Sequence, residues 1–391
     1  MSPSTKPLRV SDVRKRNEKL VLRLVHAAGE RGLSQSEVVL ATGLKPPTIF
    51  RIFSYLEEQG FIEPFAAEMG STDEPSRLEK KGRRPLAYVV KKNAYYFIGI
   101  EFWVERVSIG VFDFMGSSIY SQTKALSRSE DADKVVELIA TLVEKAIVAS
   151  SVPRNLIVGL GIGAPGQVDV AERLIVSYPR IPGMKRYPIA AILEKKLGLR
   201  VFLHNNCTVI AQSEYRYGSS KDAESMFMLL LRSGVNGAFV DEGKVFLSPR
   251  GTTIEMGHIC IDYEGPLCVC GARGCLEAFI TSMDSENLRR GNWLFEGLDP
   301  KDPSSDTALQ AAAGYISGAL QTASRLFRPS SFLLIANSEP IAAELARRTM
   351  EKLAREASSF DVIQPRVLGR AYNLQFALRG AADLVLDSFL S

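Results

Sequence analysis

One histidine and three cysteines occur close together in this chain, at a spacing that suits a metal ion. His258 is followed by Cys268, Cys270 and Cys275, so the spacing is H-x9-C-x-C-x4-C. Zinc prefers tetrahedral sulfur and nitrogen ligands, and three cysteines with one histidine are a common closed structural set. The alternative is a run of buried free cysteines. We expect these four side chains to hold one structural zinc ion per chain.

The length and composition exclude several classes of protein. The chain has 391 residues, of which 46% are hydrophobic and 24% are charged. These values exclude a disordered chain, a collagen-like chain and a small disulfide scaffold. No apolar run is long enough for a transmembrane helix, and the N-terminus lacks the apolar segment of a signal peptide. We therefore expect a cytoplasmic protein with no membrane partner.

The charge is unevenly distributed along the chain. Residues 1–92 contain 17 Lys and Arg against 11 Asp and Glu, a net charge of +6. Residues 93–391 contain 31 basic and 33 acidic residues, a net charge of −2. A small basic arm on a near-neutral body suggests that the two parts bind different partners. A solvated charged face would give the same arithmetic, so charge alone does not decide between them.

The basic arm has the pattern of a helix-turn-helix. We predict helices over residues 11–30, 34–42 and 45–60. The second opens with Ser34 and carries Glu37 three positions later, the pattern of a capping box, and the third opens with two prolines. The start of the third helix in this motif enters the major groove of DNA. The residues expected to contact DNA there are Lys45, Pro47, Thr48 and Arg51.

Two short apolar segments after the helices could form a wing. They span residues 61–65 and 86–91, and the loop between them ends in the densest basic run of the chain. Arginines on such a loop can follow phosphates or enter a narrow minor groove, so Arg83 and Arg84 are further DNA-binding candidates. A plain three-helix interaction module is the alternative. Helices, turn and wing together favour a winged helix-turn-helix over residues 1–92.

From Tyr95 onward, short strand-like runs alternate with helical segments. The predicted strands include the runs FIGIEFWV, RVSIGVFDF, LIVGLGIGA, MFMLLLR and SFLLIA. The predicted helices cover residues 130–150, 208–217, 305–328 and 338–357. This alternation predicts an α/β body over residues 93–391, with two lobes around a cleft.

The whole chain resembles the ROK family of repressors and sugar kinases, in its repressor branch with an N-terminal winged helix. The arm carries part of this resemblance, and three stretches of the body carry the rest. These stretches are GIGAPGQVD (161–169), HNNCTVIAQSEYRYG (204–218) and IEMGHICIDYEGPLCVCGARGCLEA (254–278). The last stretch is the most specific. The resemblance implies that the body has the two-lobed actin-like, or ribonuclease H-like, fold of sugar kinases.

The same resemblance assigns a sugar-binding role to a set of polar residues. They are Asn205, Asn206, Glu255, His258 and Glu277, with the loop at residues 164–166 closing one side. A carboxylate accepts hydrogen bonds from sugar hydroxyls, and an asparagine side chain both donates and accepts them. Taken singly, each of these residues could be an ordinary surface polar group.

The groups needed for phosphoryl transfer are missing from three separate segments. Family kinases place an aspartate where this chain has Asn206, and an amide cannot act as a general base. Their glycine-rich phosphate turn corresponds here to the bulky and acidic residues 101–105, and a second phosphate loop is degenerate at residues 233–238. Ile254 replaces a residue that is usually small in the family, which changes the shape of the sugar pocket. We expect no kinase activity.

These observations predict a sugar-responsive transcriptional regulator, most simply a repressor, whose arm binds double-stranded operator DNA. Operators for such arms are usually two-fold repeats, so a homodimer or homotetramer is expected. One alternative is an active ROK sugar kinase with an accessory DNA-binding arm. Another is a repressor controlled by a protein partner, with a vestigial sugar pocket. The sequence does not identify the sugar, the operator or the sign of regulation.

Overall fold

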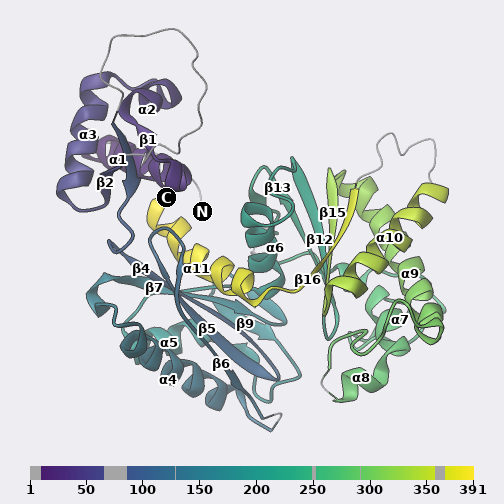
Figure 1. Ribbon diagram of the computed structural model, residues 1–391. Helices are drawn as coiled ribbons and strands as arrows, with labels where there is room; N and C mark the ends of the chain where they lie inside the picture. The colour runs from purple at the N-terminus through teal and green to yellow at the C-terminus, as the bar shows by residue number, and fades with distance from the viewer. Residues whose placement is uncertain (1–9, 66–85, 128, 249–251, 291, 357–365) are drawn as a thin grey trace.

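The computed structural model describes residues 10–65, 86–127, 129–248, 252–290, 292–356 and 366–391 (Figure 1). A small helical arm precedes two lobes, each built around a five-stranded mixed sheet. The expected fold class, a winged helix-turn-helix followed by a two-lobed α/β body, is confirmed. No helix within the described ranges combines the length and the apolarity needed to cross a membrane.

The arm consists of three helices and a three-stranded antiparallel sheet. The helices are α1 (Val10–Ala27), α2 (Gln35–Thr42) and α3 (Pro46–Glu58), and the strands, in spatial order, are β1 (Leu33–Ser34), β3 (Ala87–Val90) and β2 (Ile62–Phe65). The Ser34 hydroxyl accepts from the backbone N–H of Glu37, whose carboxylate accepts from the backbone N–H of Ser34. The predicted capping box is thereby confirmed. Gly43 ends α2 at φ +68°, which makes the tight turn into α3.

The first lobe is a sheet with helices on both faces. Its strands, in spatial order, are β11 (Val201–Asn205), β7 (Ile157–Ala164), β4 (Tyr96–Trp103), β5 (Arg106–Asp113) and β6 (Ser118–Ala125). Helices α4 (Ala132–Ser150) and α5 (Ile189–Leu197) cover one face, and α11 (Leu374–Leu390) covers the other. A small sheet of β8 (Gln167–Asp169), β9 (Leu174–Ser177) and β10 (Lys185–Tyr187) follows the loop at 164–166.

The second lobe is also a sheet between helices. Its strands, in spatial order, are β14 (Lys244–Val245), β13 (Val235–Asp241), β12 (Ser225–Leu231), β15 (Ser331–Ala336) and β16 (Arg366–Ala371). Alternate residues of β12 bury against opposite layers, which gives its unbroken apolar run. One layer is α6 (Asn206–Tyr217), and the other contains α7 (Leu276–Met283), α9 (Pro303–Phe327) and α10 (Glu339–Arg355), with α8 (Ser285–Arg290) beside α7.

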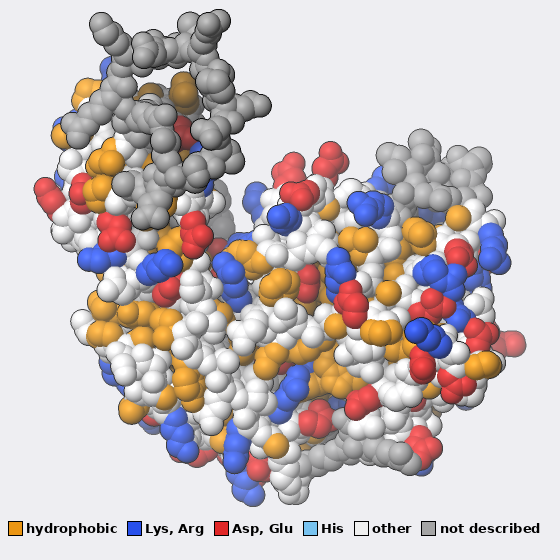
Figure 2. Space-filling view, viewed as in Figure 1, with side chains coloured by type: hydrophobic (Ala, Val, Ile, Leu, Met, Phe, Trp, Pro, Cys, Tyr) orange, Lys and Arg blue, Asp and Glu red, His pale blue; other side chains and the backbone are white. Residues whose placement is uncertain are grey.

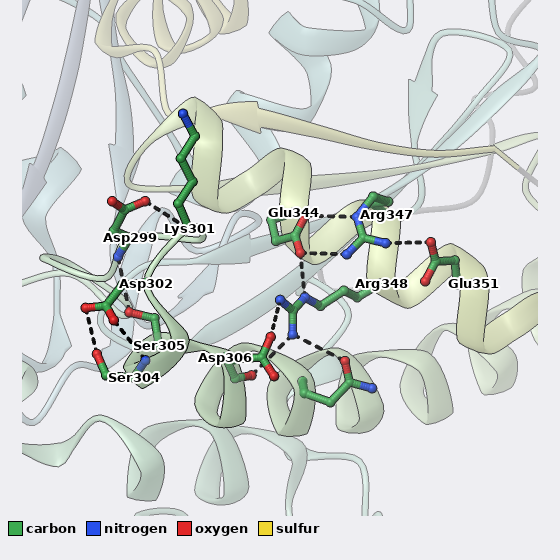
Figure 3. A network of polar contacts seen from close by, with 11 residues as sticks. Asp299, Lys301, Asp302, Ser304, Ser305, Asp306, Glu344, Arg347, Arg348 and Glu351 are labelled. Carbon is green, nitrogen blue, oxygen red and sulfur yellow. Dashed lines mark hydrogen bonds and ion pairs between the residues drawn. The ribbon is translucent and has the colours of Figure 1, made fainter.

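An ion-pair network fixes α10 against α9 (Figure 3). The side chain of Arg348, on α10, is nearly buried and donates to the Asp306 carboxylate of α9 at 2.7 Å. Arg348 also donates to Glu344 at 2.7 Å, and Arg347 binds the same carboxylate. These bonds, with those from Arg347 the strongest, lower the pKa of Glu344 to about 2. The network therefore holds the outer helical layer of the second lobe in register.

Helix α11 joins the two lobes to the arm. It lies directly on the first-lobe sheet, because a Cβ at Gly99 or Gly161 would come within 2 Å of an α11 carbonyl oxygen. Its other side packs against α6. At the C-terminal end, the ring of Phe389 lies 5.0 Å from that of Tyr95, and Lys19 of α1 donates to the backbone oxygen of Ser391. One helix thus contacts the sheet, α6 and the arm (Figure 1).

Candidate functional site

The two predicted asparagines lie at the start of α6, where it follows β11. Asn205 caps the helix: its Oδ1 accepts from the backbone N–H of Cys207 at 2.8 Å. Its Nδ2 donates to the carbonyl of Gly166 at 2.7 Å, and Gly166 has φ +73°. Asn205 therefore ties the loop at 164–166 to α6, while its amide keeps one N–H and one oxygen lone pair for a further hydrogen bond. Asn206 is buried in the first turn of α6 beside Gly163.

The predicted acidic residues come from the second lobe and lie near one another. Partial desolvation raises the pKa of Glu255, His258 lowers it, and Glu277 raises it, so these three groups interact electrostatically. The side-chain amide of Gln167, in the first lobe, also lies near enough to Glu255 to lower its pKa. Glu277 accepts from the backbone N–H of Val235 at 2.8 Å.

Glu255 connects this acidic group to the start of α6. Burial raises the pKa of the Cys207 thiol, and the charge of Glu255 raises it further. Glu255 therefore lies close to the turn that holds Asn205 and Asn206. Gln167, which the sequence analysis did not select, comes near Glu255 from the first lobe at this point. Its place directly after Gly166 is the one sequence signal that could have identified it.

The His258 and cysteine side chains form one compact cluster. The nitrogen and sulfur atoms of His258, Cys268, Cys270 and Cys275 all lie within 4.8 Å of one another. His258 Nδ1 is 3.5 Å from Cys268 Sγ, and Cys270 Sγ is 3.7 Å from Cys275 Sγ. The edges of a tetrahedral zinc site with such ligands measure about 3.4–3.8 Å. The cluster could therefore hold a metal ion, and these four donors fit zinc.

Glycines allow the chain to fold tightly around this cluster. Gly274 has φ +71°, and a Cβ there would lie 1.5 Å from the carbonyl oxygen of Asp262. Short bridges pair Cys260 with Cys275 and Leu267 with Arg273. The cluster thus holds the segment bearing Glu255 and His258 against the start of α7, which bears Glu277.

A buried ion pair occupies the segment expected to correspond to a phosphate turn. Glu101, at the end of β4, is fully buried and pairs with Arg232, which follows β12 in the other lobe. Tyr372 donates to the second oxygen of Glu101 at 2.9 Å. The Arg232 guanidinium lies against the rings of Trp103, Trp293 and Tyr372. We call these five residues the interlobe cluster.

The predicted DNA-contacting residues lie at the start of α3. Lys45, Pro47 and Arg51 are exposed and Thr48 is half-buried. Arg51 Nε donates to the Pro47 carbonyl at 3.3 Å. Arg83 and Arg84 lie outside the described residues. Sequence reasoning missed Phe50, whose ring is exposed on the same helix.

His204 is a buried histidine beside the predicted sugar site. It is buried at the end of β11, its Nδ1 accepts from the backbone N–H of Asn205, and burial lowers its pKa to about 4. Because the folded pKa lies below the ordinary value near 6.5, stability should fall as the pH drops from 6.5 to 4. The expected slope from this group is about 1.4 kcal/mol per pH unit.

Urea unfolding at pH 7.5 and pH 5, for the wild type and His204→Gln, measures this contribution. The variant should lose less stability on acidification than the wild type. Equal losses in the two proteins would show that His204 is not the group responsible.

Comparisons with known proteins agree with this architecture. The ROK family profile matches residues 97–388. A putative xylose repressor of Caldicellulosiruptor sp. (strain Rt8B.4) is 26% identical, over 77% of this chain and 72% of its own length. The crystal structure of a ROK family transcriptional regulator, described as a homologue of the E. coli MLC protein, superposes with TM-score 0.77 at 18% identity, covering 97% of both chains. A ROK hexokinase from Thermus thermophilus gives TM-score 0.62 at 26% identity, over 75% of this chain and 99% of its own. This chain belongs to the ROK family.

Proposed function

We propose that this protein is a sugar-responsive transcriptional repressor without kinase activity. Residues 1–92 would bind operator DNA, and residues 93–391 would bind a sugar or sugar derivative and form a homodimer or homotetramer in the cytoplasm. One observation carries the proposal: the chain joins a helix-turn-helix with an exposed α3 to a sugar-kinase fold whose phosphate turn is replaced by the interlobe cluster. The repressor and transcriptional regulator names among its relatives support it.

The sugar would bind between the start of α6 and the acidic group of the second lobe. The residues that would contact its hydroxyls are Asn205, Asn206, Glu255, His258 and Glu277. Asn205 would also hold the α6 turn in place. A zinc ion on His258 and the three cysteines would stiffen the segment that carries Glu255 and His258. Since His258 Nδ1 faces the cysteines, its Nε2 is the atom left for a sugar hydroxyl.

Phosphoryl transfer is disfavoured by the residues that replace its machinery. Asn206 cannot take a proton from an attacking hydroxyl. The phosphates of a nucleotide would meet the buried Trp103 and Arg232 side chains, which already pack against each other. A coupled ADP-release assay with a sugar panel tests this directly. Robust turnover would favour the alternative, a sugar kinase with an accessory DNA-binding arm.

Binding at this site could reach the arm through α11. A ligand shifts a conformational equilibrium only by its difference in affinity for the two states. Helix α11 contacts α6, which begins at the sugar site, and also α1 of the arm. Lobe closure around a sugar would therefore change the position of α1 and the spacing of paired arms on a two-fold operator.

Arg51→Ala should weaken operator binding while leaving the fold intact, because the Arg51 side chain is exposed at the start of α3. The expected loss is about 1–3 kcal/mol if the guanidinium contacts a guanine bidentately. A gel-shift titration measures it, with Arg325→Ala as a control that removes an exposed arginine from α9. Unchanged affinity in the Arg51 variant would exclude Arg51 from the contact.

A further inference from the structure

The outward face of α3 is apolar at the end that would enter DNA. One face of the helix is the core of the arm, with Ile49, Ile52, Phe53 and Leu56 buried. On the other face, Pro46, Pro47 and Phe50 are all exposed, and Phe50 exposes 59% of its surface. Pro47 and Phe50 are three positions apart, so they are neighbours on this face. An exposed apolar patch of neighbouring side chains, rimmed by polar residues, is typical of a surface that binds a partner.

Phe50 stands on a ridge between two grooves. One groove, of about 290 Å³, lies between α3 and α1 and is lined by Thr48 and Arg51 among others. The other, of about 670 Å³, lies between α3 and α2 beside β3 and is lined by Pro46 and Leu40 among others. Phe50 lines neither groove. Its exposed ring therefore lies on the outer face of α3 between the two grooves, with the polar Thr48 and Arg51 on one flank.

The charges around Phe50 suit DNA rather than an apolar protein surface. The first turn of α3 contains no acidic residue, Lys45 is exposed at its N-cap, and Arg51 is adjacent. The acidic residues of α3, Glu57 and Glu58, lie in its last turn. The end of the helix that carries Phe50 is therefore basic and apolar, while the far end is acidic.

A phenyl ring can recognise only one feature of the major groove. It offers no hydrogen bond, and the 5-methyl group of thymine is the single apolar group that base edges present there. We propose that Phe50 is a specificity-determining residue that reads thymine in each operator half-site through this methyl group. This inference rests on the proposed DNA-binding function and adds the chemistry of the base that is read.

The test compares thymine with deoxyuridine, which lacks only the methyl group. An operator is first selected from random duplex DNA with the full-length protein, and each thymine of a half-site is then replaced in turn. For the wild type, one replacement should weaken binding about fourfold, the value of one buried methylene-sized group. Phe50→Ala removes the contact from both half-sites, so it should weaken binding to the thymine operator by about the square of that factor. The same deoxyuridine replacement should cost this variant nothing more.

Two controls separate readout from other roles of Phe50. Phe50→Leu, which keeps an apolar side chain, should retain part of the thymine preference. Leu40→Ala removes another exposed apolar side chain from the arm and should leave the full preference. Two results would overturn the inference while the DNA-binding function stands. In the first, the protein binds its operator specifically but no thymine methyl group affects the affinity. In the second, the deoxyuridine replacement weakens the Phe50→Ala variant as much as it weakens the wild type. A change of sedimentation mass in Phe50→Ala would instead assign Phe50 to contacts between copies. Failure to select any operator would overturn both proposals.

Discussion

Glu101→Gln is expected to destabilise the protein by about 3–5 kcal/mol, although it changes only one side-chain group. Glu101 and Arg232 are both buried, and they belong to different lobes. Of the Arg232 nitrogens, Nη1 donates to Glu101, whereas Nε and Nη2 have no hydrogen-bond partner among the described residues and face aromatic rings. The variant would leave a buried guanidinium without its counter-charge. Chemical unfolding followed by circular dichroism measures the loss.

The double variant Glu101→Leu, Arg232→Met is the matched control. Replacing a buried ion pair with apolar side chains of similar size is often neutral or stabilising, so the double variant should regain most of the lost stability. Burial lowers the pKa of Arg232 and Glu101 raises it, which agrees with a pair whose charges depend on each other. If Glu101→Gln unfolds within about 1 kcal/mol of the wild type, the interlobe cluster does not hold the lobes together.

Cys270→Ser is expected to remove the zinc and much of the stability of the second lobe. Structural zinc sites contribute about 10–16 kcal/mol of apparent binding free energy at neutral pH in small zinc domains. The freshly purified wild type should contain about one zinc per chain, by elemental analysis. The variant should contain little zinc and should unfold at a clearly lower temperature, because the free energy of metal binding is part of the folding free energy.

Cys260→Ser controls for the loss of a thiol. Cys260 is exposed, lies in the same segment, and contributes no atom to the four-residue cluster. This variant should keep its zinc and its melting temperature. Wild-type protein without zinc, or a Cys270→Ser variant that retains it, would contradict the assignment.

Local patterns in the sequence predicted much of the fold. The capping box of Ser34 and Glu37, the arm helices and the alternation of strands and helices depend on near neighbours along the chain, and they are confirmed. The His258 cluster was also visible, because its four ligands lie within 18 residues. By contrast, β16 and α11 at the C-terminal end were not predicted, although α11 joins the lobes to the arm.

Contacts between distant segments explain what the sequence could not provide. Residues 101–105 were expected to lack a phosphate turn because they are bulky and acidic. In the structure, Glu101 is paired with Arg232, which lies 131 positions along the chain. The obstruction is therefore packing, with the charge neutralised inside it. Asn205 was expected to bind sugar, and its side chain also caps α6 and bonds the loop at 164–166. The effect of a charged side chain on a ligand depends on such partners, and so does the number of hydrogen bonds that a polar side chain can still make.

The charges on the visible face of the second lobe (Figure 2) do not indicate its function. Acidic and basic side chains are intermingled over the face seen in Figure 2, so no single-sign patch there indicates a partner. The proposal therefore depends on coupling between the two ends of the molecule. That coupling is the central claim. It requires that a ligand bound at the start of α6 changes the affinity of α3 for operator DNA.

Fluorescence anisotropy of a selected operator with the full-length protein, in the absence and presence of each sugar of a broad panel, tests this claim most directly. The account predicts tight, sequence-specific binding without sugar and a change of at least about tenfold in Kd with one sugar or sugar derivative, equal to a coupling free energy near 1.4 kcal/mol. The account would be contradicted if calorimetry shows that a sugar binds to the body while neither this sugar nor any other alters the affinity for the operator.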